Sequence, residues 1–155
     1  MINFVLFGTG RIGSLHAKNL AENKEANLLY VYDINEKVAN EVANQYNSQV
    51  VSSPEEALKD EKVSAVLIAS STATHVDLII QSAAAGKHIL CEKPIDLSIE
   101  KVNECKKQIA NFNKSIQIGF NRRYDASHAA AKQSLTDGEL GNLEKIIITS
   151  RDPSP

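Results

Sequence analysis

The sequence has little of what would place a protein in a membrane, on nucleic acid or outside the cell. Only two of its 155 residues are cysteines, which indicates a reducing compartment and no disulfide framework. The formal net charge is -2, so we expect no basic surface for nucleic acid or an anionic membrane. No apolar run approaches the roughly 18 to 20 residues that span a bilayer. We therefore expect a cytoplasmic protein that binds neither nucleic acid nor a membrane.

Two further kinds of signal are missing. The two cysteines and four histidines are scattered without metal-ligand spacing, so we expect no metal site. The apolar start Met1–Gly8 lacks a basic leader and a small-residue cleavage site, which favours a strand over a signal peptide. What remains is an ordinary globular composition, 43% hydrophobic and 23% charged. A chain of this length and composition has room for one domain and a fragment of another.

Apolar runs alternate with amphipathic helical patterns along the first 120 residues. The runs are continuously apolar, as in strands buried on both faces, and the helical stripes recur at three- and four-residue spacing. This alternation predicts an α/β fold with a doubly wound parallel sheet built from right-handed crossovers. The expected strands are Ile2–Phe7, Leu28–Tyr32, Gln49–Val51, Val63–Ala69, His88–Cys91 and Ser115–Phe120. The expected helices cover Arg11–Glu22, Val38–Tyr46, Val76–Ala84 and Ile99–Phe112, with a short one opened by Ser53 and Pro54.

The pattern changes character after Gly119. A helical stripe runs from Tyr124 to Leu135, and a β-type run follows at Lys145–Ser150. One helix and one strand cannot bury a core of their own, and such a strand would leave an unpaired edge open to another copy. We therefore expect residues 1–120 to form the sheet domain and residues 121–155 to be the truncated start of a C-terminal α/β domain.

The first motif with chemical meaning is the glycine turn Gly8-Thr9-Gly10-Arg11-Ile12-Gly13. It follows the first expected strand directly and opens the first expected helix, which is the context that this motif requires. Gly8 permits a tight turn, Gly10 lets the backbone approach a pyrophosphate, and Gly13 lets the helix pack closely on the sheet. The unpaired amides and positive end of that helix would then face the phosphates.

Asp33 lies 20 positions beyond Gly13, at the end of the second expected strand. Its carboxylate can accept both hydroxyls of an adenosine ribose and would repel a 2′-phosphate, which favours NAD over NADP. A glycine-rich turn without a ligand is the alternative, and Lys37 could soften the preference for NAD. Together the glycine turn and Asp33 predict that residues 1–120 are an NAD-binding Rossmann domain.

The second motif is Cys91-Glu92-Lys93-Pro94, at the carboxyl end of the fifth expected strand. In an open α/β sheet this edge lines the ligand crevice. A lysine there can form a hydrogen bond with a substrate hydroxyl. Where burial or cationic neighbours lower the pKa of the lysine, it can also help to remove the proton of that hydroxyl. Glu92 could orient the lysine or a ribose, and Pro94 fixes the backbone, with a cis bond open to it. The alternative is a solvated pair of charges before a turn proline.

These motifs, with His16-Ala17-Lys18-Asn19 and Gly119–Asp125, resemble the glucose–fructose oxidoreductase and inositol dehydrogenase (Gfo/Idh/MocA) family over the whole chain. The resemblance implies an N-terminal Rossmann domain and a C-terminal α/β domain that supplies substrate contacts and much of an oligomer interface. Gly119–Asp125 and Ser150–Pro155 are most similar to the inositol-oxidising members. That implies NAD-dependent oxidation of a polyol, myo-inositol to 2-inosose, by a homo-oligomer when full length.

The resemblance also implies roles for individual residues. Lys93 would be the catalytic residue that handles the substrate proton. Ser70, Ser71 and Thr72 would line the dinucleotide cleft with His75 close by, and Asn121 and Arg122 would lie near the nicotinamide and substrate. The full set implied to bind the cofactor is Gly8, Thr9, Gly10, Arg11, Ile12, Gly13, Asp33, Ser70, Ser71, Thr72, His75, Glu92, Lys93, Pro94, Asn121 and Arg122.

The family's other catalytic partners, an aspartate and a histidine four residues later, are expected beyond the end of this chain. Asp125 and His128 are three apart and are not assigned that role. We therefore expect weak NAD binding and little or no turnover from these 155 residues. Two alternatives stay open: another sugar dehydrogenase of the family, or a non-catalytic dinucleotide-binding module.

The histidines also have ordinary structural interpretations. His16 is interpreted as a packing or surface residue away from the glycine turn, and His88 as structural. His75 stays open between helix capping and a place in the cofactor cleft. His128 is interpreted as a core or interface residue.

Overall fold

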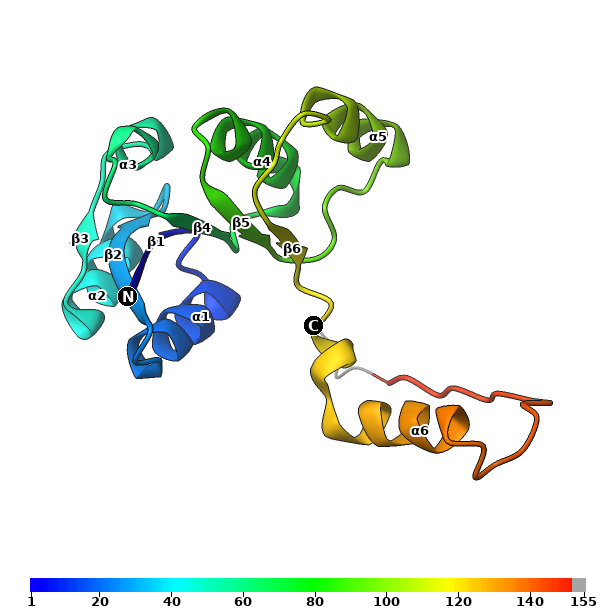
Figure 1. The fold of residues 1–155 in the computed structure, drawn as a ribbon. Coiled ribbons are helices and arrows are strands. Elements are labelled where there is room, and N and C mark those ends of the chain that lie inside the picture. Colours follow the sequence, from blue (N-terminus) through cyan, green and yellow to red (C-terminus); the bar gives the residue numbers. More distant parts are fainter. Residues whose placement is uncertain (152–155) are drawn as a thin grey trace. The chain divides into compact units, whose positions relative to one another are not determined.

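The computed structural model describes residues 1–151 and confirms the predicted doubly wound sheet (Figure 1). Its six strands are all parallel and run in the order β3-β2-β1-β4-β5-β6. The order reverses between β1 and β4, and this switch point is where open α/β sheets form their ligand crevice. The strands are β1 Ile2–Phe7, β2 Ala26–Tyr32, β3 Gln49–Val50, β4 Ala65–Ile68, β5 His88–Cys91 and β6 Ile116–Ile118.

The helices lie on both faces of the sheet, as right-handed crossovers between parallel strands require (Figure 1). Two short 3-10 helices, η1 and η2, precede α4 and α6. The bounds are α1 Arg11–Glu22, α2 Glu36–Tyr46, α3 Pro54–Lys59, η1 Thr72–Thr74, α4 His75–Ala84, α5 Ile99–Gln108, η2 Asn121–Tyr124 and α6 Ala126–Thr136.

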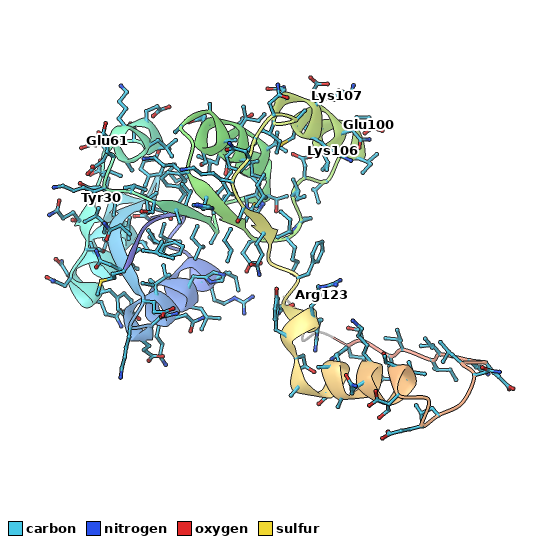
Figure 2. The ribbon with its side chains drawn as sticks, viewed as in Figure 1. Tyr30, Glu61, Glu100, Lys106, Lys107 and Arg123 are labelled. Carbon is cyan, nitrogen blue, oxygen red and sulfur yellow. The ribbon has the colours of Figure 1, made fainter. Side chains whose placement is uncertain are left out.

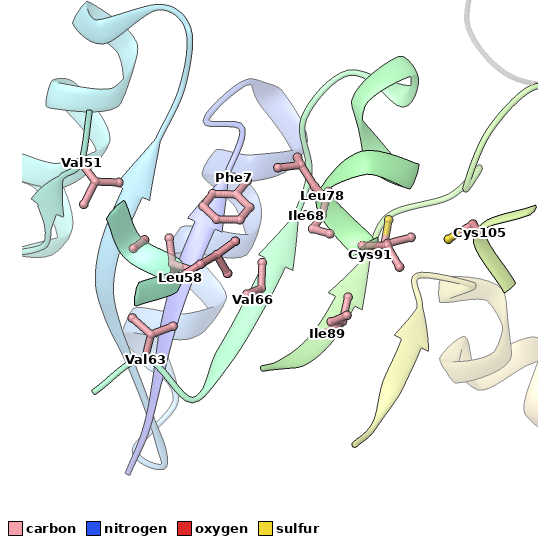
Figure 3. Close-up of a cluster of buried hydrophobic side chains, with 13 residues drawn as sticks. Phe7, Val51, Leu58, Val63, Val66, Ile68, Leu78, Ile89, Cys91 and Cys105 are labelled. Carbon is pink, nitrogen blue, oxygen red and sulfur yellow. The ribbon is translucent and has the colours of Figure 1, made fainter. Parts of the chain in front are cut away.

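Alternate residues of the central strands point to opposite faces and divide the core in two. Leu6 and Leu67 face α1 and α2, where they pack with buried residues such as Ala17. Phe7 and Ile68 face α3, α4 and α5, in the cluster drawn in Figure 3. The central strands β1 and β4 are therefore buried on both sides, which is why their sequences are continuously apolar.

Hydrogen bonds between polar groups stabilise the outer elements of the sheet domain. The Ser53 hydroxyl accepts a bond from the Glu56 amide at the start of α3, as predicted for a serine cap before a proline. Tyr30, labelled in Figure 2, donates to Asp60 across a distance of 2.8 Å. Glu100, Lys106 and Lys107 are exposed on α5 (Figure 2).

No helix in residues 1–151 is long and apolar enough to cross a membrane.

The chain divides into two compact units, Met1–Gly119 and a second that begins at Phe120. The predicted strand at Lys145–Ser150 is wrong, because these residues are exposed and adopt no regular structure. A strand is stabilised by hydrogen bonds to a neighbouring strand, and the described part of this unit contributes only η2 and α6 as regular elements. Of the Ser150–Pro155 run, residues 152–155 lie outside the described part of the chain.

The two cysteines lie in the core, where we expect them to resist alkylation. Burial and the nearby Glu92 carboxylate raise the pKa of the Cys91 thiol to about 12, and burial also raises the pKa of Cys105. Since the thiolate is the nucleophile, only about one Cys91 in ten thousand would be reactive at pH 8. Mass spectrometry after iodoacetamide treatment should show no adduct on the folded chain and two on the chain in guanidinium. Rapid labelling of the folded chain would contradict this burial.

Candidate functional site

The parallel register brings the ends of five strands into one row. Tyr32, Phe7, Ile68, Cys91 and Ile118 are successive partners across β2, β1, β4, β5 and β6. The residue that follows each of them therefore starts a loop at the same edge of the sheet. These residues are Asp33, Gly8, Ala69, Glu92 and Gly119, and four backbone bonds extend the row, from the amides of Gly8, Ala69, Glu92 and Gly119 to the neighbouring strand ends.

The three glycines of the turn meet different physical demands. Gly8 has a φ of +92°, and a Cβ there would overlap the backbone of Ser70. A Cβ on Gly13 would overlap the carbonyl of Gly8, so α1 can start this close to β1 only without a side chain at that position. Gly10 has an ordinary φ of −64°, and a Cβ there would meet nothing within 4 Å. The fold requires Gly8 and Gly13, whereas Gly10 leaves free space in front of the turn.

The N-terminus of α1 carries no capping side chain and no acidic residue in its first turn. By contrast, α2, α3, α5 and α6 each have a side-chain cap, from Asn35, Ser53, Ser98 and Asp125. The first amides of α1 and its positive end are thus available to an anion. A cavity of about 320 Å³ opens at this end, lined by Gly8, Gly10, Arg11, Ile12, Asp33, Ala69, Ser70 and Ser71.

Asp33 is held in place by three donors. The backbone amide and the hydroxyl of Thr9 donate to its Oδ2 at 2.7 and 3.1 Å, and the Asn35 amide donates to its Oδ1 at 2.9 Å. The carboxylate is half-buried and lines the cavity at the start of α1. It is therefore positioned to accept hydroxyl groups from a ligand that enters beside the glycine turn.

A second cavity of about 340 Å³ adjoins the first and shares Gly8, Asp33, Ser70 and Ser71 with it. Its walls are largely apolar, with Phe7, Tyr32 and Leu78 among them, and its size suits a flat heteroaromatic ring. No motif in the sequence predicted these walls. An apolar residue directly after Asp33 was an available signal, since Ile34 lines this cavity and is 92% exposed. The remaining lining residues are Pro54, Thr74, Asp77 and Gln81.

His75 and Thr72 follow β4 at this same edge. Thr72 begins η1, directly after Ser71. His75 is only 2% exposed, and its ring nitrogens face two backbone carbonyls, Nδ1 that of Pro94 at 2.8 Å and Nε2 that of Ser70 at 3.0 Å. His75 therefore links the loop after β4 to the loop after β5, an arrangement that neither of its two sequence interpretations described.

The loop after β5 holds the second motif. The Lys93–Pro94 peptide bond is cis, the form that the sequence analysis left open. Glu92 Oε2 accepts the Lys93 amide at 3.2 Å, and a Cβ on Gly119 would fall 3.0 Å from Glu92 Oε1. The Glu92 carboxylate is thus packed against its own loop and against the end of β6.

His16, interpreted from the sequence as a packing or surface residue, lies against the loop after β5. It lies on α1, one turn beyond Gly13, and its Nε2 is 2.8 Å from Glu92 Oε1. Both side chains are about one-fifth exposed, at 21% and 19%. Helix α1 and the loop after β5 are therefore joined by a polar contact between residues 76 positions apart in the sequence. Spacing along the chain gave no sign of it, because it depends on how α1 crosses the sheet.

The remaining predicted site residues are less enclosed. Lys93 is exposed, so residues 1–119 do not supply the burial that the sequence analysis considered for it. Asn121 and Arg122 belong to η2 in the second unit and are exposed there. Asp125 caps α6 and bonds His128 Nδ1 at 2.7 Å, which lowers the pKa of Asp125. No group of three or more possible metal ligands occurs in residues 1–151.

Known proteins are similar to this chain in sequence. A family model described as an oxidoreductase family with an NAD-binding Rossmann fold (Gfo/Idh/MocA) matches residues 2–120. The inositol 2-dehydrogenase of Rhizobium meliloti (strain 1021) is 42% identical over 154 residues, which are 99% of this chain and 46% of that protein.

Solved structures give the same result. A myo-inositol dehydrogenase from Corynebacterium glutamicum superposes with a TM-score of 0.87 at 40% identity, over 93% of this chain and 43% of that one. A scyllo-inositol dehydrogenase from Lactobacillus casei, solved with NAD(H) and scyllo-inositol, has a TM-score of 0.87 at 30% identity, over 92% and 43%. The chain spans less than half the length of these relatives. With its glycine turn, its switch-point crevice and a family match over residues 2–120, the chain belongs to the Gfo/Idh/MocA oxidoreductases.

Proposed function

We propose that this chain is the coenzyme-binding part of an NAD-dependent dehydrogenase that oxidises a cyclitol, with myo-inositol converted to 2-inosose. The observation that carries the coenzyme half of the proposal is the uncapped start of α1 beside a fixed Asp33 carboxylate. The substrate half rests on relatives named for myo- and scyllo-inositol.

The described residues fit a dinucleotide along the row of strand ends. A pyrophosphate would accept hydrogen bonds from the backbone amides at the start of α1. The free space in front of Gly10 would let it approach the backbone. Asp33 would accept the hydroxyls of the adenosine ribose. The adjoining apolar cavity, which Asp33 also lines, would take the adenine ring.

The other end of the coenzyme would lie toward the loop after β5. Bound NAD supplies the electrophilic nicotinamide carbon that accepts a hydride from the alcohol carbon. Lys93 would hold the hydroxyl of that carbon by a hydrogen bond and take part in removing its proton. Glu92 restrains the backbone of Lys93, because its carboxylate accepts a hydrogen bond from the Lys93 amide. Asn121 and Arg122 would contribute near the nicotinamide and the substrate.

The substrate contacts that distinguish a cyclitol from an aldose would come largely from outside residues 1–120. Another sugar dehydrogenase of the same family is therefore the second candidate, and a non-catalytic dinucleotide-binding module the third. A screen of cyclitols against aldoses with a version of this protein as long as its relatives separates the first two. We also propose that such a version assembles into a homo-oligomer.

Titration with NAD tests the coenzyme site directly. We expect amide signals of Gly8–Gly13 and Asp33 to shift in NMR spectra at millimolar NAD, because the pyrophosphate and ribose would contact them. Gly10→Ala should raise the Kd for NAD by about tenfold or more, since its Cβ would occupy the space left for the pyrophosphate.

Unfolding measurements on two glycine variants show whether a change in NAD binding reflects a loss of fold. Gly10→Ala should leave the free energy of unfolding within about 1 kcal/mol of the parent, because its φ is ordinary and its surroundings are open. Gly8→Ala should lower that free energy by about 2 kcal/mol or more, through its positive φ and the overlap with Ser70. An unperturbed Asp33 region at millimolar NAD would rule out the proposed site.

Turnover by this chain alone should be negligible. Hydride transfer needs the alcohol carbon held against the nicotinamide with a base aligned on its hydroxyl, and the exposed Lys93 gives little of that positioning. We expect no accumulation of NADH absorbance above background when the purified chain is incubated with NAD and myo-inositol. Robust formation of inosose by these 155 residues would overturn this expectation.

A further inference from the structure

Thr9 is the buried residue between the first two glycines of the turn. Its side chain is completely buried, at 0% exposure, although the neighbouring Gly10 is exposed. Its carbonyl accepts the Ser14 hydroxyl at 2.9 Å, which ties the turn to the first turn of α1. The Thr9 hydroxyl has a polar partner at 3.1 Å, the Oδ2 of Asp33. A fully buried hydroxyl aimed at a carboxylate is an ordered contact, because the hydroxyl cannot exchange the carboxylate for water without opening the turn.

The three donors to Asp33 differ in their dependence on sequence. The amides of Thr9 and Asn35 would be present with any residue except proline. The hydroxyl of Thr9 is the side-chain donor among the three, so it is the contact that a substitution can remove without moving the backbone. Each carboxylate oxygen accepts one of the two amides, and the hydroxyl gives Oδ2 a second bond that tightens the orientation of the carboxylate.

The orientation of this carboxylate matters for the choice between two coenzymes. A fixed carboxylate can accept a ribose diol in two hydrogen bonds, and its charge disfavours a phosphate on the same sugar. Beyond Asp33 lies a cavity of about 300 Å³. Glu36 and Ser52 line this cavity, and no described residue that lines it is a lysine or an arginine. A 2′-phosphate that turned into this cavity would find no lining cation; the cation that lines a cavity with Asp33 is Arg11, at the start of α1.

We propose that Thr9 is the positioning residue for coenzyme choice: its buried hydroxyl holds the Asp33 carboxylate so that NAD is preferred to NADP. The inference rests on the proposed binding of NAD in this crevice. Thr9 itself need not touch the coenzyme through its side chain, since that side chain faces Asp33 and is sealed from solvent.

Calorimetric titrations of the full 155-residue chain with NAD and with NADP test the proposal. Thr9→Val removes the hydroxyl at nearly constant volume, and Thr9→Ser keeps it. We expect Thr9→Val to raise the Kd for NAD and to reduce the ratio of the NADP Kd to the NAD Kd by about threefold or more, the size of one weakened hydrogen bond to a charged group. Thr9→Ser should retain most of the parent ratio.

A double-mutant cycle with Asp33→Ala links the effect to the carboxylate. In the Asp33→Ala background, Thr9→Val should no longer change the ratio of the two Kd values, because there is no carboxylate left to orient. Thermal unfolding followed by circular dichroism shows which variants are folded at the titration temperature. If Thr9→Val does not fold, the comparison of Thr9→Ser and Thr9→Ala with the parent, in both Asp33 backgrounds, takes its place.

The outcomes separate this inference from the proposed function. If the parent chain binds neither NAD nor NADP at millimolar concentration, the proposed coenzyme site fails and this inference fails with it. If the parent binds NAD but Thr9→Val weakens both coenzymes equally, Thr9 acts only on the folded population and the positioning role is refuted. A changed ratio that persists without the Asp33 carboxylate also refutes it.

Discussion

The close contact between β1 and the start of α1 is the constraint on which the rest of the site depends. Gly8 turns the chain with a positive φ, and Gly13 allows α1 to pass against the Gly8 carbonyl. No side chain fits at either point. The same contact leaves the first amides of α1 at the carboxyl edge of the sheet, without a cap from the chain itself. Packing and the proposed anion site are thus two consequences of one turn.

Much of the fold could be predicted from the sequence because the strands that carry it are buried on both faces. The apolar runs of β1 and β4 have little alternative to the centre of a parallel sheet. The ends of the strands were less well predicted. β6 covers only Ile116–Ile118 of the expected Ser115–Phe120, and the central strand β4 covers only Ala65–Ile68 of the expected Val63–Ala69. An apolar run indicates a buried strand, but the run continues past the residues that pair with the neighbouring strands.

The expected strand at Lys145–Ser150 shows what local pattern cannot supply. Ile146, Ile147 and Ile148 have strong strand propensity, yet all three are exposed, at 60%, 77% and 82%. Propensity reports how well a residue suits a pleated, half-buried surface, and it provides no partner strand. The glycine turn was predictable because its geometry requires glycine at Gly8 and Gly13, whereas the tail depends on tertiary contacts.

The contacts that sequence reasoning missed have a common cause. His16 and Glu92 are 76 positions apart, and His75 joins the loops at Ser70 and Pro94. Each pair lies at the same sheet edge only because the strands end in register. Motif spacing identifies residues that act within one turn or one helix. It cannot identify pairs brought together by how a helix crosses the sheet.

The two ends of the crevice are unequally complete within residues 1–119. Around Asp33, the carboxylate has three donors and an apolar cavity beside it, so the proposed binding of the adenosine end would need little else. Around Lys93, the side chain is exposed, and the positioned partner is Glu92, which His16 contacts from α1. A fixed nucleotide end with an open chemical end allows one coenzyme site to serve many substrates. Under the proposed function, residues outside the Rossmann fold could then change which alcohol is oxidised without disturbing the glycine turn.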